Sequence, residues 1–395
     1  MITIVILLAV AASAAFLFWP RIARATLWRA TITPLASIIG SGFLVLGPIL
    51  HVSFGWYAPF VMAVLCAGAW GFGSAIRFNI ARRATGDRSR YERWMETAAS
   101  WSLAFAYFIS VAYYLNLFGA FGTELTPWRS DAHARLLTSA MLLVILAVGW
   151  IWGFRALERL ETLSVSLKLA MIAGLLAGLA WFFVGEATTG GLIVSLPTVT
   201  GWPAIALTFG LIVTVQGFET SRYLGDEYDA ATRIRSMRLA QIISTIIYLI
   251  YILLIAYVFR PDAVPLSETA IIQLMAIVAP ILPILLTAAA LAAQFSAAVA
   301  DTGGSGGLVA ELSGGRVSIR MAYVLLVAVG LVFTWAFDVF EIIAYASRGF
   351  ALYYAIQSAI AALGARREER HALAAFYCVL AVTGLAIVVY GAPAE

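Results

Sequence analysis

The sequence predicts an all-α integral membrane protein that crosses the bilayer about twelve times. Three observations support this fold class. Of the 395 residues, 63% are hydrophobic and 12% are charged, and the mean hydropathy of +0.94 is far above that of a water-soluble domain. Apolar stretches long enough to cross the hydrocarbon core recur along the whole chain. Basic residues are concentrated in alternate connectors between these stretches.

The apolar stretches form two series of predicted spans. The first series covers residues 2–19, 33–51, 56–81, 97–122, 134–153 and 162–185. The second covers residues 201–221, 236–259, 281–313, 319–337, 338–363 and 371–391. The first stretch has no basic residue before it, so we interpret it as a retained helix rather than as a signal peptide.

The arginines predict the orientation of the spans, because basic connectors remain cytoplasmic. If Met1 lies outside, the external connectors hold only Arg129, Arg135 and Arg260. The cytoplasmic connectors then hold clusters at residues 21–29, 82–93, 155–159, 222–238, 316–320 and 366–370. One missed span would scramble this asymmetry. We therefore expect both termini outside, and a bacterial inner membrane as the location.

Other classes of function are not expected. The basic residues occur singly between apolar spans, which argues against a nucleic-acid surface. Both cysteines lie in apolar stretches, so no disulfide framework is expected. The histidines, His51, His133 and His371, lie near segment ends without acidic or thiol companions, so neither a metal site nor a cofactor is expected. No nucleophile and base occur together on candidate facing helices, which argues against an enzyme.

Two spans carry interruptions at corresponding places. One is Gly40-Ser41-Gly42 in the second span, and the other is Gln216-Gly217-Phe218-Glu219-Thr220 in the seventh. Glycine is common in membrane helices because it permits close packing, and that explanation suffices for a single stretch. Paired interruptions are instead typical of a transporter site, because unwound backbone is tolerated at membrane depth only where it lines a cavity. Free N–H groups at one half-helix and free carbonyls at the other would suit a zwitterion.

Lys168 is the only lysine, and it lies inside the span 162–185. Its side chain could extend to the interface, which would make it a structural residue. The alternative is a functional ammonium, because a charge at that depth is costly unless it finds carbonyls or a carboxylate. A buried lysine can also exchange a proton near physiological pH. Lys168 is therefore a candidate proton carrier.

Glu219, Asp301 and Arg348 are the remaining deep charges, each in a different span. They could neutralise one another as a structural network. In the functional alternative, Glu219 is a proton-sensing gate beside the helix break, and Asp301 is a coupling or substrate residue. The two alternatives remain open from the residues alone.

The interrupted spans resemble the amino acid-polyamine-organocation (APC) superfamily of LeuT-fold transporters, from about residue 33 to residue 367. Ile39-Gly40-Ser41-Gly42-Phe43 is similar to the G-S-G motif of that family's first core helix, and Gly217-Phe218-Glu219 is similar to the G-F-E of its sixth. Gly225-Asp226-Glu227 followed by Arg233-Ile234-Arg235 is similar to the segment leading into its seventh. The polar, glycine-rich segment 300–307 departs from the family pattern and leaves the substrate class open.

The resemblance implies a LeuT-type bundle with two inverted five-helix repeats, at residues 33–185 and 201–363, and helices broken near Gly40 and Gly217. One extra transmembrane helix is expected at each end, within residues 1–22 and 371–391. Ser41 and Gly42 would then contact a substrate carboxylate, and Gln216 and Gly217 would offer carbonyls to an amine. Gly40 and Phe218 are expected beside them as further substrate-binding residues.

In proton-coupled members of the family, a lysine on core helix 5 occupies the sodium position of sodium-coupled relatives. The resemblance therefore implies that Lys168 lies against the carbonyls of Ala36 and Ile39 and the hydroxyl of Ser296. We expect a secondary transporter of a small amino acid or amine that works by alternating access and couples to protons. The alternatives are a sodium-coupled or uncoupled transporter of another solute, and a solute-sensing membrane protein that does not transport. The oligomeric state is not predicted.

Overall fold

The computed structural model describes residues 1–40, 42–85, 89–151, 155–225, 227–263 and 265–394, with side chains except at 84–85 and 155–164. Within these ranges the chain forms helices and connecting loops, without a strand. The first-half helices are α1 (Ile2–Leu17), α2 (Pro20–Ala23), α3 (Thr26–Gly40), α4 (Phe43–Phe54), η1 (Gly55–Tyr57), α5 (Ala58–Thr85), α6 (Arg90–Glu124), α7 (Asp131–Ile151) and α8 (Arg155–Thr189). The second-half helices are α9 (Gly201–Gly210), η2 (Ile212–Val215), η3 (Phe218–Tyr223), α10 (Ala230–Ala256), α11 (Ala270–Val278), α12 (Leu282–Leu312), α13 (Ile319–Ala336), α14 (Val339–Arg367) and α15 (His371–Tyr390).

Each predicted span corresponds to a helix or an interrupted helix. In the described part of the chain, 8 helical segments are long and apolar enough to cross a membrane. The other predicted spans correspond to the short apolar helix α1, to the two interrupted spans, and to α14. The nine-residue helix α11 was not predicted; it is too short to cross the bilayer.

Several helices extend past their predicted cytoplasmic ends. α6 begins seven residues before the predicted start at 97, and α10 begins six residues before 236. The Ser89 hydroxyl accepts from the Glu92 N–H, and the Asp229 carboxylate accepts from the Thr232 N–H, so both early starts are capped. Hydropathy places a boundary where polar residues begin, whereas the helix continues as far as its caps permit.

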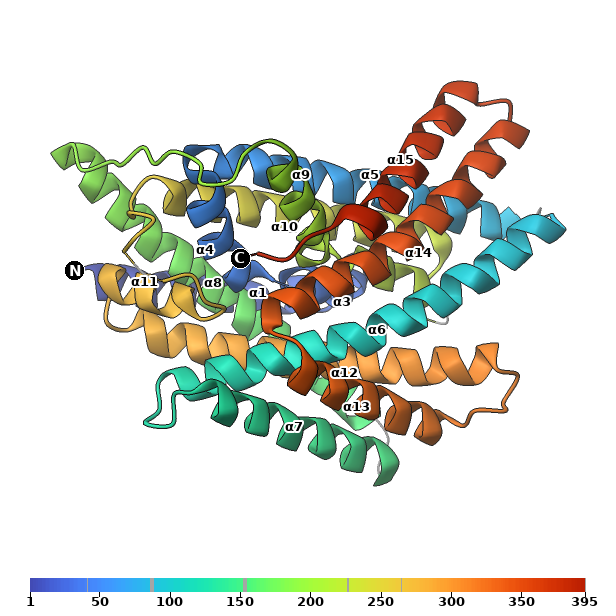
Figure 1. Cartoon of the computed structure of the whole chain (residues 1–395), viewed down its shortest axis with the longest axis horizontal. Helices are drawn as coiled ribbons and strands as arrows, with labels where there is room; N and C mark the ends of the chain where they lie inside the picture. Colours follow the sequence, from blue (N-terminus) through green and yellow to red (C-terminus); the bar gives the residue numbers. More distant parts are fainter. Residues whose placement is uncertain (41, 86–88, 152–154, 226, 264, 395) are drawn as a thin grey trace.

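α6 forms the centre of the bundle, in contact with α12, α14, α7 and α13. Of its most apolar 18 residues, 83% are buried, compared with 22% for α7 and for α15, which therefore lie at the periphery. Figure 1 shows α6, α12 and α14 running across much of the molecule, whereas the short helices α4 and α9 lie away from its ends. The interrupted spans therefore lie among long, continuous helices.

The extra helix α1 packs along α8, the helix that carries Lys168. Two glycines of α8 permit this close approach. A Cβ atom on Gly174 would lie 2.5 Å from Val10, and one on Gly178 would lie 3.0 Å from Ile6. Ile6 is fully buried in the contact. α8 is thus supported by α1 on one side while it contacts α3 on another.

Candidate substrate and coupling site

The first interruption lies between α3, which ends at Gly40, and α4, which begins at Phe43. Gly42 is extended, and a Cβ atom on it would lie 2.7 Å from the Cβ of Thr214 in the second interruption. Only glycine fits such an approach. Ser41, a predicted carboxylate ligand, lies outside the described residues.

The second interruption is longer than the motif at Gly217 predicted. α9 ends at Gly210, a short 3-10 turn follows, and Gln216 is extended before Gly217 reaches φ +117°. A Cβ atom on Gly217 would lie 2.5 Å from the Ser37 hydroxyl and 2.6 Å from the backbone nitrogen of Ile38. The two interruptions therefore lie directly against each other.

Three carbonyls in the last turns of α3 accept hydrogen bonds from side chains of three other helices. The ammonium of Lys168 (α8) donates to the carbonyl of Ala36 at 2.9 Å. The hydroxyl of Tyr248 (α10) donates to that of Ile38 at 2.9 Å, and the amide of Gln294 (α12) donates to that of Gly40 at 3.3 Å. The broken end of α3 is thus held by α8, α10 and α12.

Lys168 is buried, and its ammonium would lie 3.5 Å from a Cβ atom on Gly40. A positive charge is favourable here because the end of α3 presents carbonyl oxygens. Ile39 is buried on the same turn of α3. Ser296 is partly buried on α12, between Ala293 and Ala297, whose atoms lie within 4 Å of the Gly40 Cβ position.

Tyr248 contacts both interruptions, since its hydroxyl also lies 2.6 Å from the carbonyl oxygen of Thr214. We expect Tyr248→Phe to lower the free energy of unfolding by about 1–3 kcal/mol, because the single buried O–H that the Ile38 and Thr214 carbonyls share is lost. Thermal unfolding of the detergent-solubilised protein measures the effect. Tyr251→Phe is the matched control, because the Tyr251 hydroxyl makes one long bond of 3.4 Å to Leu44. Equal melting temperatures for the two variants would contradict the role of Tyr248.

Glu219 is fully buried directly after the second interruption. One carboxylate oxygen accepts from the Gly217 N–H and from the Tyr354 hydroxyl, each at 2.9 Å. The other oxygen has no hydrogen-bond partner in the described part of the chain. Phe218 stacks on Tyr354 with ring centroids 5.1 Å apart. The carboxyl group therefore links the backbone of the interruption to α14.

Asp301 is 5% exposed on α12 and accepts a hydrogen bond from the Ser110 hydroxyl of α6. Its carboxylate and that of Glu219 are near enough to interact electrostatically. Gln216 extends toward the same region, where its amide donates to the Tyr114 hydroxyl at 2.9 Å. Among the described residues, no lysine or arginine forms an ion pair with either carboxylate. The site thus combines one ammonium and two buried carboxyl groups around two helix interruptions.

Comparisons with known proteins agree with this architecture. A family profile described as APC superfamily transporter matches residues 20–391. The chain belongs to the APC superfamily. An uncharacterized protein of Aquifex aeolicus (strain VF5) is 39% identical to this APC transporter over 394 residues, which cover 96% of this chain and 94% of the relative.

A solved structure supports the fold. It is described as the substrate-bound outward-open state of a Na+-coupled sialic acid symporter with a novel Na+ site. The TM-score is 0.55 at 15% identity, and the match covers 100% of this chain and 98% of the symporter. The predicted fold, an all-α membrane protein of LeuT type with two interrupted helices, is confirmed. The APC transporter is therefore an integral membrane protein.

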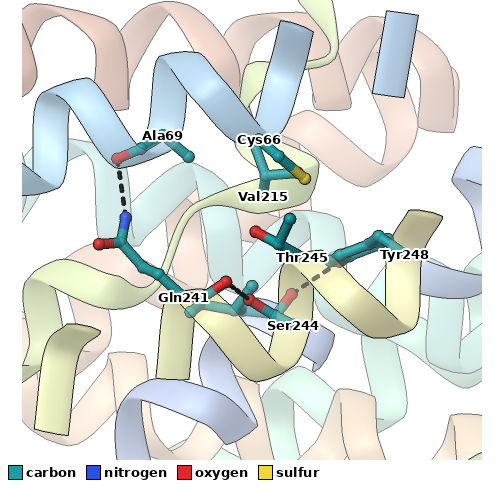
Figure 2. A pocket seen from close by; sticks show the side chains of 8 residues that line it. Cys66, Ala69, Val215, Gln241, Ser244, Thr245 and Tyr248 are labelled. Carbon is teal, nitrogen blue, oxygen red and sulfur yellow. Dashed lines mark hydrogen bonds between the residues drawn. The ribbon is translucent and has the colours of Figure 1, made fainter. Parts of the chain in front are cut away.

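A small void lies beside the interruptions of the APC transporter. It has a volume of about 10 Å³ and is lined by Ile38 and Val215 and by residues of α5 and α10. Figure 2 shows Cys66 and Ala69 on one side of this void and Gln241, Ser244, Thr245 and Tyr248 on the other. That volume admits about one water molecule.

Ion pairs cluster at the start of α6 in the APC transporter. Glu92, at the start of α6, accepts from Arg82 of α5 at 2.8 Å and from Arg367 of α14 at 3.0 Å. One turn further along α6, Glu96 pairs with Arg222 of η3, which also donates to Gln357 of α14. The pairs tie α5, α6, α14 and the second interruption together.

A second, polar cavity of about 180 Å³ lies at the opposite end of α6. Asn116, Asp131, Arg135, Glu268 and Asp338 contribute polar groups to its lining. Burial raises the pKa of the Glu268 carboxyl, and the neighbouring carboxylates of Asp131, Glu124 and Asp338 raise it further. Asn116, which lines this cavity, lies two residues along α6 from Tyr114, the hydrogen-bond partner of Gln216 in the second interruption.

Sequence reasoning missed the partners of the buried charges. Tyr248, Tyr354 and Ser110 are polar residues in apolar helices, where a hydroxyl gives no sign of which element it faces. Arg222 and Glu96 each lie one residue outside a predicted span, where they cannot be distinguished from ordinary connector charges. Arg348, predicted among the deep charges, is not brought to the site: it donates to the carbonyl of Gly391 at the end of the chain.

Proposed function

We propose that this APC transporter moves a small amino acid or amine across the membrane by alternating access and couples the movement to protons through Lys168. The observation that carries the proposal is the bond from the Lys168 ammonium to the Ala36 carbonyl at the broken end of α3. A protonated lysine ties α8 to α3, whereas a neutral lysine loses most of that attraction. A proton at Lys168 would therefore favour one arrangement of the first interruption over another.

Glu219 and Asp301 extend the proposal to a second protonation step. Both carboxyl groups are buried and electrostatically coupled, so protonating one reduces the repulsion of the other. Glu219 holds the Gly217 N–H and the Tyr354 hydroxyl, and its protonation would weaken both bonds. In this scheme Glu219 is the gate, Asp301 is the coupling residue, and Gln216, Gly217 and Gly42 lie against the solute.

The solute is identified first, by thermal shift of the purified protein against amino acids, amines and small anions, because a ligand of the folded state raises the melting temperature. Uptake of that solute into proteoliposomes is then driven by a pH gradient. We expect Lys168→Ala to abolish proton-driven uptake while the protein remains folded. Lys168→Arg is the matched control: it keeps the charge and the donor but cannot release a proton. It should therefore retain the thermal shift and lose the proton-driven uptake.

Proton-driven uptake by Lys168→Ala at the wild-type rate would contradict the coupling role. Sodium coupling is the second candidate, because the structural neighbour is named as a Na+-coupled symporter. Stimulation of uptake by a sodium gradient at fixed pH would select it. If no small solute shifts the melting temperature and none is taken up, a solute-sensing membrane protein with another ligand becomes the better assignment.

We further propose that the chain lies in a bacterial inner membrane with its N-terminus outside and its last span directed outward. The support is the distribution of arginines, with three in the external connectors and the rest of the connector arginines on the other side. The residues paired in the ion-pair cluster, Arg82, Glu92, Glu96, Arg222 and Arg367, then lie at the cytoplasmic end.

A further inference from the structure

The segment after the last helix does not leave the bundle; it lies along one face of α9, the outer half of the second interrupted span. Tyr390, the last residue of α15, packs edge-on against Trp202, with ring centroids 5.0 Å apart. The N–H of Ala392 donates to the carbonyl of Ala206 at 2.9 Å. Figure 1 shows the C-terminus near α4 and α9, in the middle of the molecule rather than at an end.

Gly210 is the third contact on α9. A Cβ atom there would lie 1.8 Å from the carbonyl oxygen of Ala392, so the segment touches α9 where any side chain would displace it. Trp202, Ala206 and Gly210 are spaced four residues apart and share one face of the helix. Gly210 is also the last residue of α9, so the segment ends beside the interruption itself.

Arg348 of α14 holds the segment from the other side. Its Nε and Nη2 donate to the Gly391 carbonyl oxygen at 3.1 and 2.7 Å, and its guanidinium lies 5.5 Å from the Tyr345 ring. No carboxylate of the described residues lies within ion-pair distance of it. A membrane-embedded arginine is expensive, so it is expected to be retained for a specific bond. Here that bond is with the backbone of the terminal segment.

The neighbouring residue on α14 holds the interruption directly. The Ser347 hydroxyl donates to the Gly210 carbonyl at 2.6 Å and accepts from the Val213 N–H at 3.0 Å. Ser347 thus fixes the end of α9, and Arg348 fixes the segment that lies on α9. α9 cannot separate from α14 while both sets of bonds are intact.

We propose that residues 390–394 act as a strap that holds α9 against α14, with Arg348 as the positioning residue, and that the strap is released whenever the outer half of the second interrupted span moves. The proposal concerns this chain's own segment and does not depend on the solute or on the coupling ion. It assigns a role to Arg348, a predicted deep charge that the candidate site does not use.

Labelling of a single cysteine tests the strap. Ala394 is 8% exposed, so Ala394→Cys in a protein with Cys66→Ala and Cys378→Ala reports whether the segment is docked. The protein is reconstituted in lipid nanodiscs and treated with a water-soluble maleimide. We expect Arg348→Gln and Gly210→Ala to accelerate labelling about tenfold or more, because each removes or displaces a contact of the strap.

The controls match each change. Arg135→Gln also removes an arginine that donates to a backbone carbonyl, that of Trp335. Gly307→Ala adds a methyl group to a membrane helix where no atom lies within 4 Å. Both should leave the labelling rate unchanged. Equal rates in the parent and in Arg348→Gln, or rapid labelling of the parent, would overturn the proposal.

A disulfide tests whether release accompanies movement. Ala206→Cys and Ala392→Cys, in the same cysteine-free background, place thiols at a pair joined by a backbone hydrogen bond. We expect the oxidised protein to exchange the amide hydrogens of residues 211–217 about tenfold more slowly than the reduced protein. Failure of the disulfide to form, or equal exchange in both forms, would overturn the strap. Neither measurement requires transport, so a failed coupling assignment leaves the result interpretable.

Discussion

Gly217→Ala is expected to give a protein that is recovered poorly and unfolds at a much lower temperature. Two costs add at this position. A residue with a side chain at φ +117° is strained by about 1–3 kcal/mol. The new methyl group would also lie 2.5 Å from the Ser37 hydroxyl and 2.6 Å from the Ile38 nitrogen, and such overpacking costs about a further 1–3 kcal/mol. The interruptions would have to separate to accommodate it.

Two controls divide these costs. Gly190→Ala introduces a side chain at φ +75° in open space, so it carries the backbone strain alone. Gly307→Ala carries neither cost. The melting temperature in detergent should therefore be highest for Gly307→Ala, lower for Gly190→Ala and lowest for Gly217→Ala. A Gly217→Ala protein as stable as Gly190→Ala would show that the two interruptions are not in contact.

Glu92→Gln is the second change with a large expected effect. The Glu92 side chain is 1% exposed and pairs with Arg82, which is 10% exposed. Removing the negative charge takes from Arg82 its buried counter-ion and leaves Glu368, which is 40% exposed, at 3.3 Å. Breaking a buried pair costs about 3–5 kcal/mol at most when no other counter-ion is near. We expect a correspondingly lower melting temperature, and faster proteolysis at the end of the bundle where α6 begins, because α5, α6 and α14 lose a common anchor.

Glu341→Gln on α14 is the matched control for this change. Glu341 and Glu92 occupy the same position of a capping box, with Asp338 and Ser89 as the respective N-caps. Glutamine can serve a capping box. Glu341 has no described ion-pair partner, so Glu341→Gln should be nearly neutral. In a double-mutant cycle, the free energy of unfolding lost in Glu92→Gln with Arg82→Gln should be smaller than the sum of the two single losses. If the two losses simply add, the ion pair is not the source of the Glu92→Gln effect.

The sequence was sufficient to predict the fold, because membrane spans follow from hydropathy and the helix interruptions from glycine motifs at corresponding places. It also singled out Lys168, whose charge stands out in an apolar span. The start of the second interruption at Gly210 was not predicted, because an isolated glycine in an apolar helix is ordinarily a packing residue. A glycine is required at residue 210 because the backbone of Ala392 lies against it, and this contact joins segments far apart in sequence.

The polar partners of the site were beyond prediction for a similar reason. Tyr248 acts by bridging carbonyls of α3 and η2, and both bonds depend on how three helices meet. Helical periodicity predicts which face of one helix a residue occupies but not which neighbour that face meets. The ion pairs of Glu92 and Glu96 likewise join residues that hydropathy had assigned to separate connectors.

The packing of α1 on α8 has a consequence for biosynthesis. α1 emerges from the ribosome before α8, whereas the groove at Gly174 and Gly178 that receives Ile6 and Val10 is made only when α8 is synthesised. α1 must therefore reside in lipid without its partner during that interval. Its sequence permits this, since residues 2–17 carry no charged side chain. The contact between α1 and α8 forms only when α8 is inserted beside α1, which is already in the bilayer.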